Sequence, residues 1–318
     1  MKIEVDIDFI KKWNKAFSEY FKWEIDNRSL IRSKLNFMKY KIILPWHPLF
    51  FRSDLENILE NKNFSFLNKL NNIYGLTCIP ENKIPKFKKL KISKENLLLH
   101  YINIENENID NLFKRFKYNV RREIRLGYKK YKFSKINSIY EFRNYKDEIN
   151  NMLIKQNLAF NSPSPPIDLI ENLFLNKAID LYTATLKNTI VGFMSMSTDR
   201  NIMQVAWAAK KYNEKDLSIS FHHFCLEEAI KRKAKIFSLG TTSSNSLAKF
   251  KEKLNAERAI LIKRKIKYAI TSNKFQYLKS QRNRINLIIM KIFIRIIYSL
   301  FGVRGYEFIS KEIWRRFD

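Results

Sequence analysis

The sequence predicts an α/β (α+β) protein with mixed, mostly antiparallel sheets, and three observations support this prediction. Three runs rich in Thr, Val, Ile, Phe, Met, Tyr and Trp follow one another over residues 181–209, and such residues favour strands. The breaks at Lys187-Asn188 and Asp199-Arg200-Asn201 have the turn chemistry that joins antiparallel neighbours. Apolar residues make up 45% of the 318 residues and aromatic residues 14%, which is ample for a core and excludes a disordered chain.

These strands open a β-β-β-α-β-α-β order that extends over residues 181–263. The first helix is predicted at residues 216–233, because apolar residues recur on one side of its wheel. A short strand at residues 235–239 follows and leads into a Gly-Thr-Thr-Ser-Ser-Asn-Ser loop. A second helix and a last strand near residues 259–268 complete this part of the chain.

The chain before these strands is predicted to mix short helices and strands. Residues 1–35 are polar with scattered aromatic residues, which indicates a helix or two. Helical apolar spacing predicts helices at residues 54–70 and 139–159, and a further helix ends near residue 178. Strands are predicted at residues 41–44, 72–80 and 96–104.

A strongly basic segment, residues 112–132, is predicted to be a single helix. Leu112, Phe116, Val120 and Ile124 recur every fourth residue and give the helix one apolar seam. Most of its other positions are Lys or Arg. Taken alone, this pattern is also that of an exposed basic helix that has no role beyond contact with solvent.

Three short motifs stand out in the chain. They are NVRREIRLG (residues 119–127), the strand end IFSLG (residues 236–240) and SLAKFK (residues 246–251). Together they resemble the N-x-R-R-x-x-R-x-G helix, the Y/F-D-F/L-G strand end and the G-L-x-x-F-K run of the FemAB-like branch of the GNAT acyltransferase superfamily. Ser238 stands where Asp is usual in the second motif. The resemblance covers residues 46–263.

The resemblance implies two GNAT-like halves that pack together. On this basis residues 1–135 are expected to form a degenerate N-terminal half and residues 136–270 the acyltransferase half. Residues 271–318 form a separate basic amphipathic tail.

The resemblance also implies acyl transfer without a covalent enzyme intermediate. Such an enzyme holds an activated acyl group beside an amine, takes a proton from the ammonium and stabilises an oxyanion. In GNAT-type folds the strand before the long helix, here residues 204–208, separates from its neighbour and binds the acyl carrier, while the helix N-terminus receives pyrophosphate. The Gly-rich pyrophosphate loop of the superfamily is absent here, so both acyl-CoA and aminoacyl-tRNA stay open as donors.

Three groups of residues are expected to form the site. The carrier-binding (cofactor-binding) residues lie on that strand, on the turn after it and at the helix start: Gln204, Val205, Ala206, Lys210, Lys211, Ser218 and Ser220. The acceptor-binding residues lie on the basic helix and in and after the 240–246 loop: Arg121, Arg122, Thr241, Thr242, Ser243, Asn245 and Lys249, with Lys251 also expected to reach a phosphate. The expected proton acceptors are Glu214, His222 and His223. The ordinary alternatives are a packed or solvated histidine for His222 and His223, a helix-capping acid for Glu214, and a turn followed by an N-cap for the 240–246 loop.

The charge balance indicates an anionic partner. The sequence has 60 Lys and Arg against 31 Asp and Glu, a formal net charge of +29, which favours nucleic acid, an anionic membrane face or phosphorylated small molecules. A composition biased toward Lys, Asn and Ile explains part of this excess. Two cysteines are too few for a disulfide framework, and the four histidines have no metal-site spacing with a cysteine, so no metal is expected.

The tail contains the run RINLIIMKIFIRIIYSLF (residues 284–301), which is apolar around most of a helical wheel. Arg284, Lys291, Arg295 and Tyr298 form one narrow polar stripe on it. Cations in the middle disfavour a helix that spans a membrane, and favour one that lies in the headgroup plane of an anionic membrane. A helix that covers the core or forms a dimer is an equally open interpretation.

Three functions are compatible with these features. The preferred one is an N-acyltransferase that moves an acyl group from acyl-CoA to an amino sugar or a lipid- or nucleotide-linked precursor of the cell envelope. The alternatives are a tRNA-dependent aminoacyl transferase of the peptidoglycan-bridge type and a non-catalytic RNA- or membrane-binding protein. The tRNA-dependent transferase is ranked below the N-acyltransferase because no heptad insertion of coiled-coil length is present. The N-terminus lacks an apolar signal core, which predicts a cytoplasmic protein, with attachment to the inner face of the membrane left open.

Overall fold

A computed structural model provides the structure of the chain. It describes residues 6–22, 24–25, 31–35, 39–43, 72–74, 76–79, 91–159, 162–211, 214, 216–242, 245–267 and 275–316. The predicted helix at residues 54–70 and the predicted contact residue Ser243 lie outside these residues.

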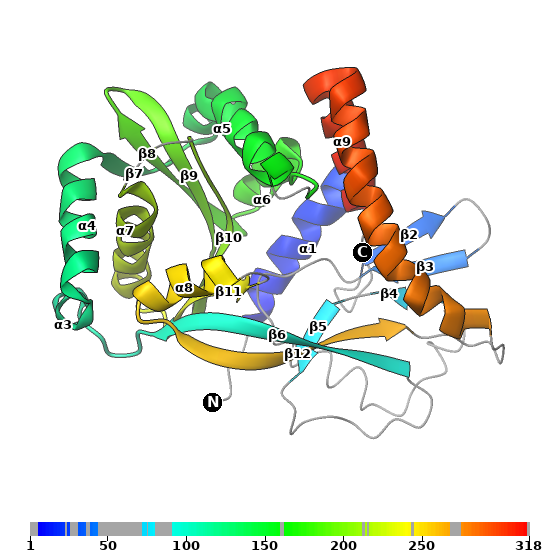
Figure 1. Ribbon diagram of the computed structural model, residues 1–318, viewed down its shortest axis with the longest axis horizontal. Helices are drawn as coiled ribbons and strands as arrows, with labels where there is room; N and C mark the ends of the chain where they lie inside the picture. Colours follow the sequence, from blue (N-terminus) through cyan, green and yellow to red (C-terminus); the bar gives the residue numbers. More distant parts are fainter. Residues whose placement is uncertain are drawn as a thin grey trace.

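An eight-stranded sheet forms the centre of the described structure (Figure 1). Its strands, in spatial order, are β5 (Leu76–Ile79), β12 (Glu257–Lys267), β6 (Lys91–Asn103), β11 (Ile236–Thr242), β10 (Ile202–Lys210), β9 (Thr189–Ser197), β8 (Ile179–Leu186) and β7 (Lys132–Lys135). All neighbours in it are antiparallel except β10 and β11. A four-stranded sheet consists of β1 (Glu24–Ile25), β2 (Ile31–Leu35), β3 (Lys39–Ile43) and β4 (Asn72–Tyr74), in which only β3 and β4 are parallel. The prediction of mixed, mostly antiparallel sheets is confirmed.

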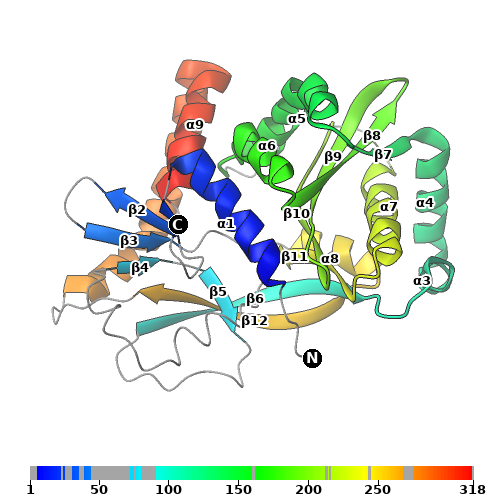
Figure 2. The same ribbon diagram turned by 180° about the vertical axis from the view of Figure 1, so that it is seen from behind.

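Helices cover both faces of the strands β7 to β10 (Figures 1 and 2). On one face α1 (Ile7–Phe21), α5 (Ile139–Ala159) and α6 (Ile167–Leu175) bury Phe9, Trp13, Phe17 and Phe142 in a common core. On the other face α7 (Leu217–Lys231) lies between the sheet and the pair α3 (Ile109–Arg115) and α4 (Tyr118–Lys130). The short α8 (Asn245–Lys253) connects β11 to β12. The order β8-β9-β10-α7-β11-α8-β12 matches the predicted β-β-β-α-β-α-β order.

Both predicted turns join their strands as expected. Lys187 and Asn188 both have positive φ, 48° and 63°, as a tight two-residue hairpin requires. At the next turn the buried carboxylate of Asp199 accepts hydrogen bonds from the backbone N–H groups of Asn201 and Ile202, both at 2.8 Å. The same carboxylate accepts one from Asp6 at 2.7 Å, which ties the start of α1 to this turn.

Several predicted elements differ from the structure. The basic helix is not continuous, because Phe116 and Lys117 have extended ψ angles of 144° and 150° that separate α3 from α4. Residues 1–35, where a helix or two was expected, contain the single helix α1, followed by the strands β1 and β2, which were not expected. The strand predicted at residues 72–80 is two strands, β4 and β5, which belong to different sheets.

The tail forms a helical hairpin, α9 (Phe275–Arg316), that reverses at Gly302. Gly302 has φ 61° and ψ −152°, a conformation that side chains with a Cβ rarely adopt. Gly305 lets the two arms meet, because a Cβ there would lie 2.4 Å from the Cβ of Phe301. The second arm returns to the body, where the rings of Trp314 and Trp207 lie 6.0 Å apart. In Figure 1 the C-terminus accordingly lies well below the upper, red end of α9.

Each arm of α9 packs on the core through a buried side chain, Ile294 in the first arm and Tyr306 in the second. Ile294 and Tyr306 are fully buried and contact Ile154 of α5. The Tyr306 hydroxyl donates a hydrogen bond to the carbonyl of Ser162 at 2.7 Å. Among the helices in the described ranges, none is long and apolar enough to cross a membrane.

Candidate functional site

The site begins where strands β10 and β11 separate. Their parallel pairing includes only Ile202–Ile236, Met203–Phe237 and Gln204–Ser238. At the last pair the Ser238 hydroxyl donates to Oε1 of Gln204 at 3.1 Å and accepts from the backbone N–H of Gly240 at 3.2 Å. Gly240 has φ 72°, and the register of β11 with β6 shifts at this point, so β11 bends away from β10. The separation expected for strand 204–208 is present.

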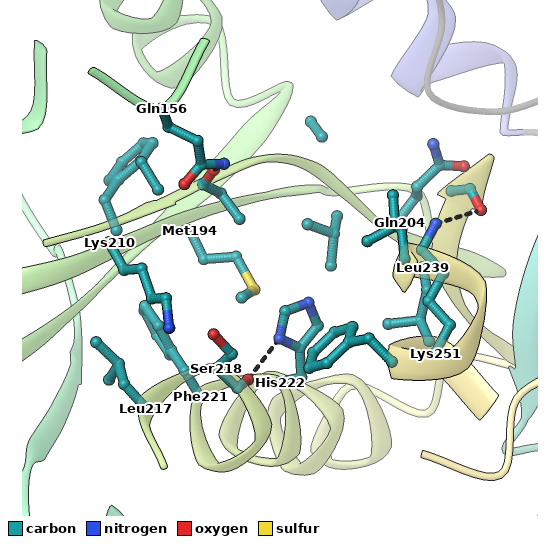
Figure 3. Close-up of a pocket in the computed structure, with 18 residues that line it drawn as sticks. Gln156, Met194, Gln204, Lys210, Leu217, Ser218, Phe221, His222, Leu239 and Lys251 are labelled. Atoms are coloured by element: carbon teal, nitrogen blue, oxygen red, sulfur yellow. Dashed lines mark hydrogen bonds between the residues drawn. The ribbon is translucent and has the colours of Figure 1, made fainter. Parts of the chain in front are cut away.

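A cavity of about 430 Å³ fills the space between the two strands. Its wall is largely apolar, with side chains such as Phe193, Met194, Leu217 and Phe221. The polar residues in the wall are Gln156, Gln204, Lys210, Ser218, His222 and Lys251. A mostly apolar cavity of this size with a few convergent polar groups is typical of a small-molecule site. Figure 3 shows Lys210 and Lys251 at opposite ends of the cavity, with His222 between them.

Lys251 is the most unusual of these residues, because only 4% of it is exposed. It extends from α8, and its Nζ donates a hydrogen bond to the carbonyl of Gly240 at 2.9 Å. Burial lowers the pKa of Lys251 to about 8, since a low-dielectric surrounding disfavours the charged form. The side chain therefore places a titratable cation at the end of the cavity where β11 bends.

His222 projects from α7 into the cavity. Its Nδ1 lies 2.7 Å from the carbonyl oxygen of Ser218, which can only accept, so Nδ1 carries the proton and Nε2 has a free electron pair. Figure 3 shows Nε2 directed toward the centre of the cavity. Burial, and then the positive charge of Lys251, lower the pKa of His222 to about 4, which keeps the imidazole neutral at physiological pH.

Positive groups surround the opposite end of the cavity, at the N-terminus of α7. Lys210 lines the cavity, and its Nζ donates to the backbone carbonyl of Glu214 at 3.1 Å. Ser218, in the first turn of α7, also lines the cavity. Lys130 from the end of α4 reaches the same turn through the Glu214 carboxylate. A helix N-terminus with cations beside it is suited to hold phosphate groups.

The other predicted carrier residues divide between the cavity and its surroundings. Gln204, Val205 and Ala206 line the cavity. Lys211 does not line it, and Ser220 is wholly buried with its hydroxyl donating to the carbonyl of Asp216 at 2.6 Å. Ser220 packs against Gly127 of α4, so its position is explained by helix packing rather than by a ligand.

Two of the three predicted proton acceptors lie outside the cavity wall. Glu214 accepts hydrogen bonds from Tyr131 at 2.7 Å and from Lys130 at 3.0 Å, which lower the pKa of its carboxyl group. His223 belongs to the α4–α7 contact, where its Nδ1 lies 3.1 Å from the hydroxyl of Tyr128. Burial lowers the pKa of His223 to about 4. We therefore keep only His222 as the candidate base.

Three of the predicted acceptor-binding residues, Arg121, Arg122 and Lys249, do not line the cavity. Arg121 and Arg122 lie on α4, which is separated from the sheet by α7, and Nη1 of Arg121 donates to the carbonyl of Lys114 at 3.2 Å. Lys249 is exposed on α8. Thr241 and Thr242 end β11, and Asn245 begins α8, but their side chains lie outside the part of the chain that the structure describes.

Two polar residues of the cavity wall, Lys251 and Gln156, were not predicted in the positions that they occupy. Lys251 was expected to reach a phosphate, and the structure shows it buried against β11; the F-K pair of its motif was the signal. Gln156 donates from Nε2 to the carbonyl of Ala208 on the free edge of β10 at 2.6 Å. Nothing in the sequence around Gln156 distinguishes it from a solvated helix residue.

Among the described residues, no group of three or more His, Cys, Asp or Glu could hold a metal ion.

The fold is shared with solved structures that include FemX, which confirms the resemblance to the FemAB-like branch at the level of the fold. Solved structures share it over most of their length. FemX superposes with a TM-score of 0.61 at 11% identity, with 85% of this chain and 96% of FemX covered. The C-terminal domain of a putative lysylphosphatidylglycerol synthetase from Agrobacterium fabrum superposes with a TM-score of 0.52 at 9% identity, with 81% of this chain and 91% of that domain covered. L-PGS from Bacillus licheniformis superposes with a TM-score of 0.51 at 11% identity, with 87% of this chain and 95% of L-PGS covered. No protein-family model and no curated protein matches the sequence.

Proposed function

We propose that this protein is an acyltransferase that moves an activated acyl group from a phosphate-bearing carrier to an amine inside the cavity between β10 and β11. The observation that carries the proposal is the separation of these strands after Gln204 and Ser238, which opens the cavity beside the N-terminus of α7. The edge of β10 beyond Gln204 is not paired with β11, so its backbone groups are available to a ligand.

The two ends of the cavity have different tasks in this proposal. The phosphates of the carrier bind at the α7 N-terminus, near Lys210 and Ser218, and the acyl group extends along β10 toward Lys251. Gln156 holds the carbonyl of Ala208 and thereby fixes the edge of β10 against which the acyl chain lies.

The chemistry follows from the remaining polar groups. The amine nitrogen attacks the acyl carbonyl carbon, and a proton passes from that nitrogen to Nε2 of His222 as the bond forms. The Lys251 ammonium stabilises the oxyanion in a cavity that excludes most water. The bond to the carrier then breaks, and the leaving thiolate or alkoxide takes up the proton from Nε2 of His222, which returns the imidazole to its neutral form.

Acyl-CoA is the first candidate donor, because a pantetheine arm matches the open edge of β10 and its phosphates match the cations at the α7 N-terminus. Aminoacyl-tRNA is the second, and the strong positive charge of the chain favours it. A putative lysylphosphatidylglycerol synthetase shares the fold, and its name describes a lysyl group on a lipid. For an acceptor we propose an amine of a cell-envelope precursor, and we place the protein in the cytoplasm.

The test uses purified full-length protein with acyl-CoA donors of increasing chain length, amino-sugar acceptors and detection of free thiol. A parallel reaction supplies labelled aminoacyl-tRNA and follows transfer of the label. We expect Lys251→Met to abolish transfer and the exposed neighbour Lys249→Met to retain it. No transfer from either donor, or equal rates for the two variants, would contradict the proposal.

A further inference from the structure

The first arm and the turn of the α9 hairpin expose large apolar side chains that no described element covers. The exposed fractions are 68% for Leu300, 64% for Phe301, 53% for Ile292, and 47% each for Phe293 and Ile296. Contiguous exposed apolar groups of this size indicate an interaction surface rather than ordinary surface composition.

These side chains lie on the side of the helix opposite its contact with the core. Ile294 is fully buried against α5, and on a helix of 3.6 residues per turn Phe293, Ile296 and Leu300 point roughly the other way. The buried contact fixes the orientation of the arm. Because Ile294 is held against α5, the side chains of Phe293, Ile296 and Leu300 face away from the core.

Cations accompany the exposed apolar side chains. Arg295 and Arg304 are both exposed beside them. The sequence of α9 contains nine Lys and Arg against two Glu, and the chain as a whole carries +29. A subunit interface that repeated this surface would bring like charges together, whereas an anionic lipid surface is complementary to it.

We propose that the α9 hairpin docks the protein on an anionic lipid bilayer, with Phe293, Ile296, Leu300 and Phe301 inserted at the level of the headgroups. Arg295 and Arg304 contact lipid phosphates in this arrangement. The hairpin lies on the surface, since no described helix is suited to cross the bilayer. This inference is independent of the acyl transfer proposed above.

The experiment measures flotation of the full-length protein with vesicles of phosphatidylcholine alone and of phosphatidylcholine with 30% phosphatidylglycerol. The wild-type chain is expected to float with the anionic vesicles and not with the neutral ones, and high salt is expected to weaken the binding. The variant Phe293→Ser/Leu300→Ser should bind at least about tenfold more weakly, because it loses two inserted side chains. Arg295→Gln/Arg304→Gln should weaken binding to anionic vesicles as well.

The matched control is Tyr140→Ser/Leu175→Ser, which removes two side chains of similar kind, 76% and 50% exposed, on α5 and α6. It should float as the wild type does, and circular dichroism should show that all variants are folded. Equal flotation of Phe293→Ser/Leu300→Ser and the control would overturn the proposal. So would a wild-type chain that ignores anionic vesicles but is a dimer by light scattering, since the hairpin would then be a subunit interface.

Discussion

Lys251→Met should make the protein more stable while it removes activity. Burial lowers the pKa of Lys251 from its ordinary 10.5 to about 8. At 1.36 kcal/mol for each pKa unit, burial destabilises the protonated amine by about 3 kcal/mol. Methionine has a side chain of similar length but cannot donate the hydrogen bond to the Gly240 carbonyl, which is worth about 1 kcal/mol. The net gain in the free energy of unfolding at neutral pH is therefore about 2 kcal/mol.

The gain should depend on pH in a defined direction. Below pH 8 the lysine is protonated in both the folded and the unfolded chain, so the full burial penalty is present. Between pH 8 and 10.5 the folded chain has released this proton and the unfolded chain has not, so the wild type becomes more stable relative to Lys251→Met as pH rises. Above 10.5 the difference due to this group disappears.

Thermal and urea unfolding measure this difference, with Lys249→Met as the control for removing a lysine from α8. For a chain of this length the melting temperature of Lys251→Met should rise by about 3 °C at pH 7. A buried lysine that destabilises the fold is best explained by a functional requirement. If Lys251→Met is less stable than the wild type at pH 7, the side chain contributes to folding and this reasoning is refuted.

Two further predictions concern the faces of α7. His222→Ala should lower kcat by about 10²–10⁴-fold, as loss of a general base does. In the wild type, the pH profile of kcat/KM should stay level below pH 7, because the pKa of His222 is about 4, and should fall as pH rises through 8, where Lys251 loses its charge. Gly127→Ala should destabilise the protein by about 1–3 kcal/mol, because the new Cβ would lie 2.3 Å from the Cβ of Ser220 and the helices must separate. Ser220→Gly in the same chain should recover much of that loss in urea unfolding, and no recovery would mean that the contact has been misassigned.

The order of elements from β8 to β12 could be predicted because each signal is local. The strand runs between residues 179 and 210 are long, and their turns carry residues suited to positive φ, as at Lys187 and Asn188. The break between α3 and α4 could not be predicted, since the four-residue interval between apolar residues, here Phe116 and Val120, continues across it. There the tertiary packing of Phe116 overrides a regular pattern.

The site residues were harder to predict, and α7 shows why. His222 and His223 are adjacent, so they project about 100° apart on the helix and face different partners. Because α7 packs against the sheet on one side and against α4 on the other, both directions are partly or wholly buried, and hydrophobic spacing cannot identify the side that faces the cavity. Lys249 and Lys251 present the same difficulty on α8, where one lysine is exposed and the other buried.

The eight strands form two groups, which are joined only by the three residue pairs between β10 and β11. One group contains β7 to β10 and the other contains β5, β12, β6 and β11. A molecule bound in the cavity contacts both groups of strands where β10 and β11 are not hydrogen-bonded, so its binding stabilises the two groups together. Slower amide exchange on donor binding should consequently reach β6 and β12, which lie beyond the strands that the ligand itself contacts.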